Sequence, residues 1–339
     1  MRPDPSSRFG AGLTLALLSA FSFATSGTLA AGLLAAGWSP LGVVIPRVAI
    51  GCAVTLVFAL VALRGRWDVV RRNWRVILGY GVISMALTQL AHFSAVQYMQ
   101  VAQALLFQYL APVAIVFWLW ARRGERPAGQ TVLGAILAMG GLMLVLQVGA
   151  AGLSFDYRGI LWSTVALVGN ASYFIFSSDN RPDLPPVVMA AGGTLVASVL
   201  LVVVALLGLL PFQTSTAPVT YAGLDVPWWV PLVVLGVVAT AAAYLLGIAG
   251  ARLLGTRLAS FVGLVEVLFA IVLAALLVGQ ILTVWQWVGG MLVLGGVVLV
   301  KLGEARTGTR PVVLRRTRAP EPSPVDPPPA PAQVEDLVR

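Results

Sequence analysis

Very few side chains in this sequence could support covalent or metal chemistry. The 339 residues include one cysteine, Cys52, and one histidine, His92, so neither an intrachain disulfide nor a cysteine-cluster or His-pair metal site can form. The single lysine, Lys301, is not preceded by the glycine-rich spacing of a Walker A nucleotide site. We therefore expect no catalytic residues, no cofactor and no metal site.

One carboxylate lies within a long apolar stretch. Glu266 comes nine residues after Arg257, which is about 13.5 Å along a helix and near the middle of a ~30 Å hydrocarbon core. A carboxylate at that depth costs about 2.5–3.5 kcal/mol on insertion scales, so we expect it to face the protein interior. Glu266 could bind substrate or carry a proton. The alternative is a structural carboxylate that is hydrogen-bonded to a neighbouring helix.

Other polar side chains also fall within apolar stretches, where a polar group suggests a function. Asn170, Tyr173 and Ser177 are spaced to share one helix face, and Ser19, Ser22 and Ser26 have the same spacing. Such serine stripes are more often packing seams than binding surfaces. The predicted substrate-binding residues are Ser22, Ser26, Gln89, His92, Gln108, Tyr109, Asn170, Tyr173, Tyr244 and Glu266, and Pro112 is the predicted hinge.

The chain that positions these residues is too apolar to be soluble. Hydrophobic residues make up 59% of it and charged residues 10%, whereas a soluble domain has about a quarter charged. Its apolar runs match the ~20 residues of a membrane-spanning helix. The sequence predicts an all-α polytopic membrane protein with ten transmembrane helices, at about 10–33, 40–63, 76–97, 100–121, 128–148, 159–178, 186–210, 228–248, 258–278 and 283–302.

Arginine and lysine fall on one side of this predicted path. Arg158 is the only arginine or lysine in the loops on the opposite side, which are 34–39, 98–99, 149–158, 211–227 and 279–282. This asymmetry predicts that both termini are cytoplasmic in an inner or plasma membrane. Because the net charge of +9 comes from loops and the C-terminal segment, we expect the lipid bilayer, and no nucleic acid, as partner.

The chain contains an internal repeat. Shifting the sequence by 155 residues aligns 74–145 with 229–300 without a gap, placing Trp74 on Trp229 and glycine on glycine at five positions. Two of these glycine pairs involve Gly134, Gly141, Gly289 and Gly296. Small residues spaced seven apart allow close helix packing, either within the chain or at the seam of a homodimer.

Because each copy has an odd number of helices, the second copy must enter the membrane from the side opposite to the first. We predict one five-helix repeat over 1–150, an inverted five-helix repeat over 155–302, and a disordered Pro/Arg-rich cytoplasmic tail over 303–339. Inverted repeats are typical of alternating-access transporters, whose substrate site lies near the midplane. The alternative is that duplication only built a stable bundle.

The segment 95–146 resembles part of the repeat of the EamA-type branch of the drug/metabolite transporter superfamily. It has a small-residue turn into the fourth helix, Pro112 within that helix, the pair Gly124–Glu125 and a glycine-rich fifth helix. The resemblance covers about residues 10–302. It implies a central cavity surrounded by helices 1, 3, 4, 6, 8 and 9, and export or import of amino acids and other metabolites without ATP.

Two departures from the family pattern concern the second repeat. Val267 follows Glu266 where the family usually has proline, and Gln280 follows Gly279 where it usually has glutamate. We therefore expect helix 9 to bend less than helix 4. Arg47 lies in helix 2, which the resemblance places outside the cavity, so we expect it to be structural.

These observations favour a secondary transporter of a small organic metabolite, such as an amino acid or related compound, with export favoured by the resemblance. A membrane-embedded enzyme is the first alternative, but it would need paired catalytic groups at bilayer depth, and Glu266 is the only clearly intramembrane acid. A non-transporting scaffold acting through the tail is the second alternative.

Overall fold

The computed structural model describes residues 5–124, 126–148, 156–279, 281 and 283–307. The described chain is mainly helical, and nine helical segments are long and apolar enough to span a membrane. The tenth, α7, is apolar and shorter. The first repeat contains α1 (Pro5–Ala35), α2 (Pro40–Leu63), α3 (Asp68–Gly79), η1 (Tyr80–Leu87), α4 (Thr88–Ala95), α5 (Val101–Tyr109), α6 (Ala111–Arg123) and α7 (Gly129–Val145).

The second repeat has the same order of elements. It contains α8 (Tyr157–Ser178), α9 (Pro186–Leu206), α10 (Trp229–Gly236), η2 (Val237–Ala242), α11 (Ala243–Leu254), α12 (Thr256–Gly263), α13 (Val265–Val278) and α14 (Val284–Thr307). Ten helical segments therefore follow the ten predicted ones. Helix α14 continues to Thr307, and the rest of the predicted tail, from residue 308, lies outside the described residues.

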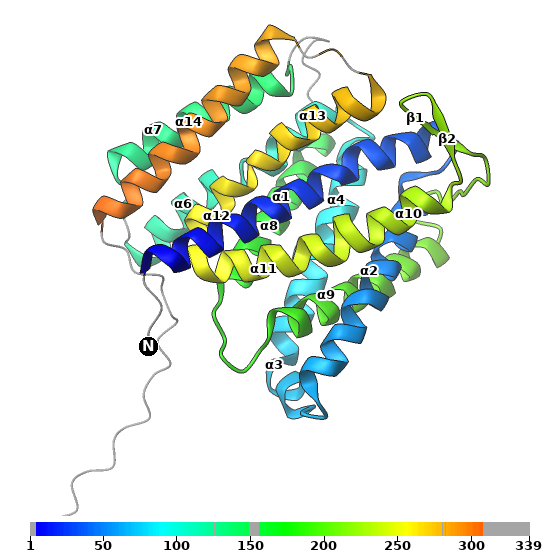
Figure 1. Ribbon diagram of the computed structural model, residues 1–339, viewed down its shortest axis with the longest axis horizontal. Helices are drawn as coiled ribbons and strands as arrows, with labels where there is room; N and C mark the ends of the chain where they lie inside the picture. The colour runs from blue at the N-terminus through cyan, green and yellow to red at the C-terminus, as the bar shows by residue number, and fades with distance from the viewer. Residues whose placement is uncertain (1–4, 125, 149–155, 280, 282, 308–339) are drawn as a thin grey trace, which may run out of the picture.

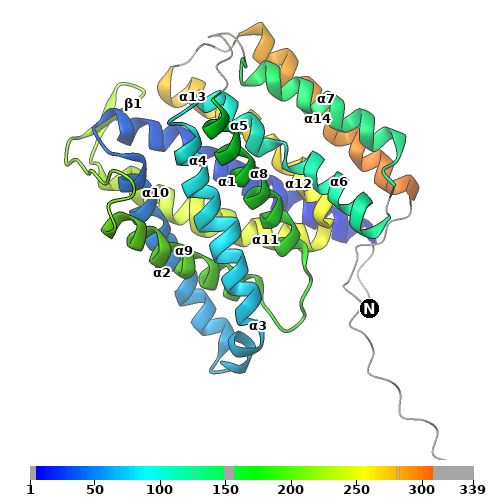
Figure 2. The same ribbon diagram turned by 180° about the vertical axis from the view of Figure 1, so that it is seen from behind.

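Helices α7 and α14 lie side by side at the edge of the bundle (Figures 1 and 2). A Cβ added to Gly134 would lie 2.6 Å from the carbonyl oxygen of Gly296, and one added to Gly141 would lie 2.5 Å from that of Gly289. The two helices, equivalent in the repeat, are thus antiparallel, as expected when the second copy is inverted. These glycines pack within one chain, so they do not form the homodimer seam considered from the sequence.

The contact between α7 and α14 can be tested, and the neighbouring residue Gly140 serves as the control. Gly141→Ala is expected to lower the free energy of unfolding by about 1–3 kcal/mol, because the methyl group would meet backbone and force α7 from α14. Gly140→Ala should be neutral or stabilising, because a Cβ there meets nothing within 4 Å and alanine favours helix. Unfolding of the purified variants in detergent measures both. Equal effects at the two positions would contradict close packing of Gly141 against α14.

Two π-helical segments occur at matching positions of the repeats, a feature that the apolar pattern did not predict. The hydroxyl of Thr88 donates to the carbonyl of Ile83 at 3.0 Å, and that of Thr240 donates to Leu235 at 3.0 Å. Both bonds reach five residues back, as the wider π turn requires. Each π segment ends two residues before a polar residue, Gln89 or Tyr244. Such segments are frequent at functional sites because they rotate the following side chains.

A β-hairpin lies at the end of the bundle opposite the start of α1 (Figure 1). Its strands are β1 (Val219–Tyr221) and β2 (Leu224–Val226), within a segment predicted only as a loop. Ala222 and Gly223 both have positive φ, as a tight hairpin turn requires. The Tyr221 hydroxyl donates to the Leu29 carbonyl of α1 at 2.6 Å, and the Ala222 N–H donates to Leu277 of α13 at 2.8 Å. Burial raises the pKa of Tyr221 to about 12, so the hydroxyl stays a donor at neutral pH.

Candidate functional site

A cavity of about 620 Å³ lies between the two repeats. Its walls come from α1, α2, η1, α4, α5 and Pro112 of the first repeat and from α8, α11, α12 and α13 of the second. Helices α7 and α14 do not line it, as the resemblance implied. The predicted site residues found in its lining are Ser26, Gln89, His92, Gln108, Tyr109, Asn170, Tyr173, Tyr244 and Glu266, together with the predicted hinge, Pro112.

Ser22 is the predicted site residue that the cavity lining does not include. It is buried, and its hydroxyl donates at 2.8 Å to the Leu18 carbonyl of its own helix. Ser19, from the same stripe, donates at 2.7 Å to the Ala243 carbonyl of α11. The hydroxyls of Ser19 and Ser22 are therefore used in helix packing, and Ser19 and Ser26 are the stripe residues that line the cavity.

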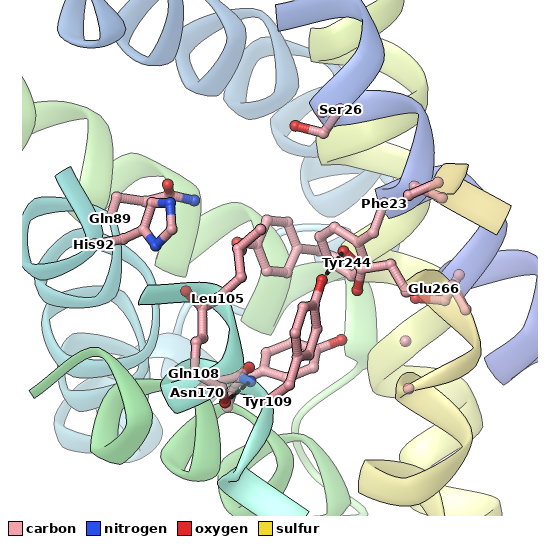
Figure 3. Close-up of a pocket in the computed structure, with 18 of the residues that line it drawn as sticks. Phe23, Ser26, Gln89, His92, Leu105, Gln108, Tyr109, Asn170, Tyr244 and Glu266 are labelled. Atoms are coloured by element: carbon pink, nitrogen blue, oxygen red, sulfur yellow. Dashed lines mark hydrogen bonds between the residues drawn. The ribbon is translucent and has the colours of Figure 1, made fainter. Parts of the chain in front are cut away.

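Glu266 lies at the boundary between the repeats. It lies in the first turn of α13, and its Oε1 accepts a hydrogen bond of 3.2 Å from the Tyr109 hydroxyl of α5 (Figure 3). Tyr109 belongs to the first repeat and Glu266 to the second, so this bond joins them across the cavity. A carboxylate that bridges two halves in this way suits a group that changes partners as they move.

Asn170 has a contact that explains its position. Pro112 has no N–H to give to the carbonyl four residues earlier, which belongs to Gln108. The Asn170 Nδ2 of α8 donates to this carbonyl at 3.0 Å (Figure 3). Helix α5 ends at Tyr109 and α6 begins at Ala111, so the chain is interrupted here. Asn170 thus replaces the donor that the proline removes.

This replacement can be tested with a double-mutant cycle. Asn170→Leu is expected to cost about 1–3 kcal/mol of unfolding free energy, because the Gln108 carbonyl loses its donor. In a Pro112→Ala background a backbone N–H is restored, so the same substitution should cost much less. Ser172→Ala on the same helix is the control, because its exposed hydroxyl bonds only to Val168 of its own helix. An equal cost of Asn170→Leu in both backgrounds would disprove the compensation.

The second repeat breaks its equivalent helix without a proline. Helix α12 ends at Gly263 and α13 begins at Val265, which matches the α5–α6 break. The Val267 N–H donates to the Leu264 carbonyl three residues back at 3.1 Å. A Cβ on Gly263 would lie 2.8 Å from the Phe174 ring. The absent proline therefore does not leave helix 9 continuous, although we had expected less bending there.

Aromatic rings form one wall of the cavity beside Glu266. Phe23, Tyr173 and Tyr244 pack edge to face, with ring centroids 5.0 Å apart for Phe23–Tyr244 and 5.8 Å apart for Tyr173–Tyr244. Figure 3 shows Phe23 and Tyr244 close to Glu266. Phe23 was not among the predicted site residues, because an apolar ring in an apolar helix gives no signal. The wall can hold an apolar or aromatic part of a ligand.

Arg47 also lines the cavity, contrary to the prediction that helix 2 lies outside it. Helix α2 starts at Pro40, and Pro40, Val43, Val44 and Arg47 form one helical face that lines the cavity wall. The Arg47 Nη1 donates to the Ser26 hydroxyl of α1. The expectation that helix 2 lies outside the cavity lining is therefore wrong. The physical reason is that one face of α2 is turned towards the cavity, which the resemblance did not indicate.

The two ends of the cavity differ. The lining residues Leu34 and Val101, towards the hairpin end, are 41% and 56% exposed. At the other end, Ala251 and Ala259 are buried. Beyond them α1 and α11 approach closely, since a Cβ on Gly12 would lie 2.8 Å from Leu253. The cavity is thus open at the hairpin end and closed at the end where most loop arginines lie.

The closed end has a further contact, between two helices of the second repeat. The Ser178 and Thr256 hydroxyls, at the end of α8 and the start of α12, are hydrogen-bonded.

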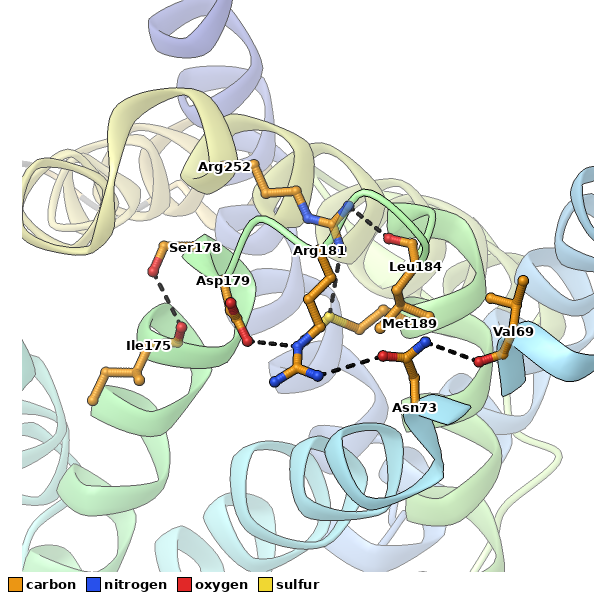
Figure 4. Close-up of polar contacts among 9 residues, drawn as sticks. All are labelled: Val69, Asn73, Ile175, Ser178, Asp179, Arg181, Leu184, Met189 and Arg252. Atoms are coloured by element: carbon orange, nitrogen blue, oxygen red, sulfur yellow. Dashed lines mark hydrogen bonds and ion pairs between the residues drawn. The ribbon is translucent and has the colours of Figure 1, made fainter. Parts of the chain in front are cut away.

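A polar cluster lies nearby (Figure 4). Arg181 Nε pairs with Asp179 at 2.7 Å, and its Nη1 donates at 3.4 Å to Asn73 Oδ1 of α3. Arg252 of α11 donates at 2.7 Å to the Leu184 carbonyl before α9. These contacts hold the basic end together.

Inverted five-helix repeats around a shared cavity define a class of polytopic membrane transporter. The family model of the EamA-like transporter family matches residues 10–147 and 157–302, one repeat in each match. The chain belongs to this family, and it is an integral membrane transporter.

The chain is also similar to two curated transporters. It is 28% identical over 243 residues to the "Uncharacterized inner membrane transporter YicL" of Salmonella typhimurium, covering 70% of this chain and 76% of that protein. It is 29% identical over 273 residues to an "Uncharacterized transporter" of Archaeoglobus fulgidus, covering 80% and 91%. A solved structure titled "Crystal structure of protein" has the same fold, with a TM-score of 0.68 and 24% identity over 90% of this chain and 99% of that one.

Proposed function

We propose that this protein is a secondary transporter that moves a small organic metabolite, such as an amino acid or related compound, by alternating access without ATP. The observation that carries the proposal is the cavity between inverted repeats, open at one end and closed at the other. A rocking motion of the repeats would close the hairpin end and open the basic end. The substrate would then meet each side of the membrane in turn.

Flux through purified protein tests this proposal. In nucleotide-free liposomes, the protein should exchange or accumulate a labelled substrate under an imposed gradient, and protein-free liposomes should not. The substrate is chosen beforehand by thermal-shift screening of amino acids, nucleobases, sugars and polyamines. A strict requirement for ATP hydrolysis by this chain would overturn the proposal.

We also propose that both termini are cytoplasmic, which would make the open end of the cavity face outwards. Among the described residues, the hairpin end carries Arg158, whereas the arginines of the α2–α3 and α6–α7 connections lie at the other end. Reporter fusions after residue 303 and within 212–218 should report opposite sides of the membrane. A C-terminal reporter active outside the cytoplasm would reject this orientation. Export as the physiological direction rests on the family resemblance.

A further inference from the structure

We infer that Arg47 binds an anionic oxygen group of the transported solute and selects solutes that carry one; this inference rests on the proposed function. Arg47 lies in the cavity wall, where Ser26 accepts from its Nη1. Its Nε is buried and has no hydrogen-bond partner among the described residues. A guanidinium offers five donors in a planar fork that matches a carboxylate. Donors therefore remain for a ligand.

No carboxylate of the protein neutralises this guanidinium by direct contact in the part of the chain that is described. The ion pairs there are Arg72–Asp68 and Arg181–Asp179, both outside the cavity. Glu266 acts on Arg47 electrostatically but not as an ion-pair partner, and it already accepts a bond from Tyr109. A cation within a membrane span is costly unless it is paired. An anionic ligand would supply the missing partner.

The repeat itself indicates that the fold does not require an arginine at this position. Gly236 of the second repeat packs against the Arg47 carbonyl of the first, and its repeat partner, Gly81 of the first repeat, packs against the Gly193 carbonyl of the second. Arg47 and Gly193 therefore occupy equivalent places in α2 and α9. The second repeat builds the same contact with glycine, so the side chain of Arg47 is available for a role in the cavity.

The surroundings of Arg47 indicate the rest of the ligand. The cavity of about 620 Å³ also contains the aromatic wall of Phe23, Tyr173 and Tyr244. His92, whose Nδ1 has no partner among the described residues, also lines it. A solute with one carboxylate-like group and an apolar or aromatic body fits both features. A fully cationic or uncharged solute would leave the guanidinium unpaired.

Matched acid–amide pairs test this inference, since they differ in charge but hardly in shape. The probes are acetate and acetamide, benzoate and benzamide, and phenylacetate and phenylacetamide, added to purified full-length protein in detergent. Thermal shift and competition with labelled substrate are the measurements. At least one acid should bind at least about tenfold more tightly than its amide. If no acid is preferred over its amide, the inference is overturned.

Variants identify the residue responsible. Arg47→Gln should remove the acid preference, lowering acid affinity by about tenfold or more while amide affinity stays unchanged. Arg47→Lys should retain part of the preference, because it keeps the charge but loses the fork. Arg75→Gln, an exposed arginine of α3, is the control and should behave as wild type. An acid preference that survives in folded Arg47→Gln would overturn the assignment.

Two further outcomes separate this inference from the proposed function. Transport of neutral solutes with no acid preference would leave the transporter in place and reject the anion site. Acid binding at Arg47 with no flux of any solute in liposomes would support the anion site and reject secondary transport. Displacement of the acids by chloride alone, at equal affinity, would indicate a site for inorganic anions and reject selection of organic solutes.

Discussion

Replacing Glu266 by glutamine is expected to abolish gradient-driven accumulation while the protein still folds and binds its substrate. Glutamine keeps the shape of the side chain and can still accept the hydrogen bond from Tyr109, but it cannot carry a proton or a charge. If Glu266 couples transport to an ion gradient, accumulation in liposomes should fall to the background of protein-free vesicles. Exchange of substrate at equal concentrations on both sides should persist, because it needs no driving ion.

The same experiment can show that Glu266 is only structural. In that case Glu266→Gln should accumulate substrate as wild type does, and Glu266→Ala should instead lower the melting temperature. Tyr109→Phe is a matched control, since it removes the hydroxyl that Glu266 accepts from but leaves the carboxylate. Normal accumulation by Glu266→Gln would therefore reject the coupling role.

Locking the closed end of the cavity is expected to stop transport completely and reversibly. Ser178 and Thr256 already touch through their hydroxyls, so cysteines at both positions can form a disulfide with little movement. The background is Cys52→Ala, which removes the only native thiol. Oxidation should abolish flux because opening of the basic end would have to separate α8 from α12 within the second repeat, and a reductant should restore it.

Each single-cysteine variant should transport normally under oxidation, which excludes damage by the oxidant. Binding of substrate from the hairpin end should survive in the locked protein, because the exposed lining at Leu34 and Val101 is unaffected. Transport by the locked protein at the rate of the reduced protein would show that α8 and α12 do not separate during the cycle.

Much of this architecture follows from simple regularities in the sequence. Apolar runs of membrane length located the helices, and tryptophan and glycine matches at a fixed shift identified the repeat. The sequence also predicts a depth for Glu266, because Arg257 marks one end of its apolar run and helices have a constant rise. The structure locates it at the boundary between the repeats, where it accepts a bond from Tyr109.

Other features depend on the backbone path and could not be read. The bond from Asn170 to the Gln108 carbonyl exists because Pro112 leaves that carbonyl without its usual donor, and no pattern links residues so far apart. The π segments change the direction of Gln89 and Tyr244 without altering composition. Arg47 was misplaced because lining depends on how far α2 turns towards the cavity, and the resemblance alone had placed that helix outside.

The inverted repeat has a consequence for how charge can be distributed in the cavity. If the two repeats were identical separate chains, every charged residue at the site would occur twice, related by the pseudo-twofold axis. Two guanidiniums or two carboxylates facing one another would repel. Joined in one chain, the copies can accept different mutations. Arg47 then faces a cavity whose equivalent position is Gly193, and Glu266 corresponds to Ala111 in the 155-residue alignment. Gene fusion thus permits a polar, one-sided cavity inside a nearly symmetric scaffold.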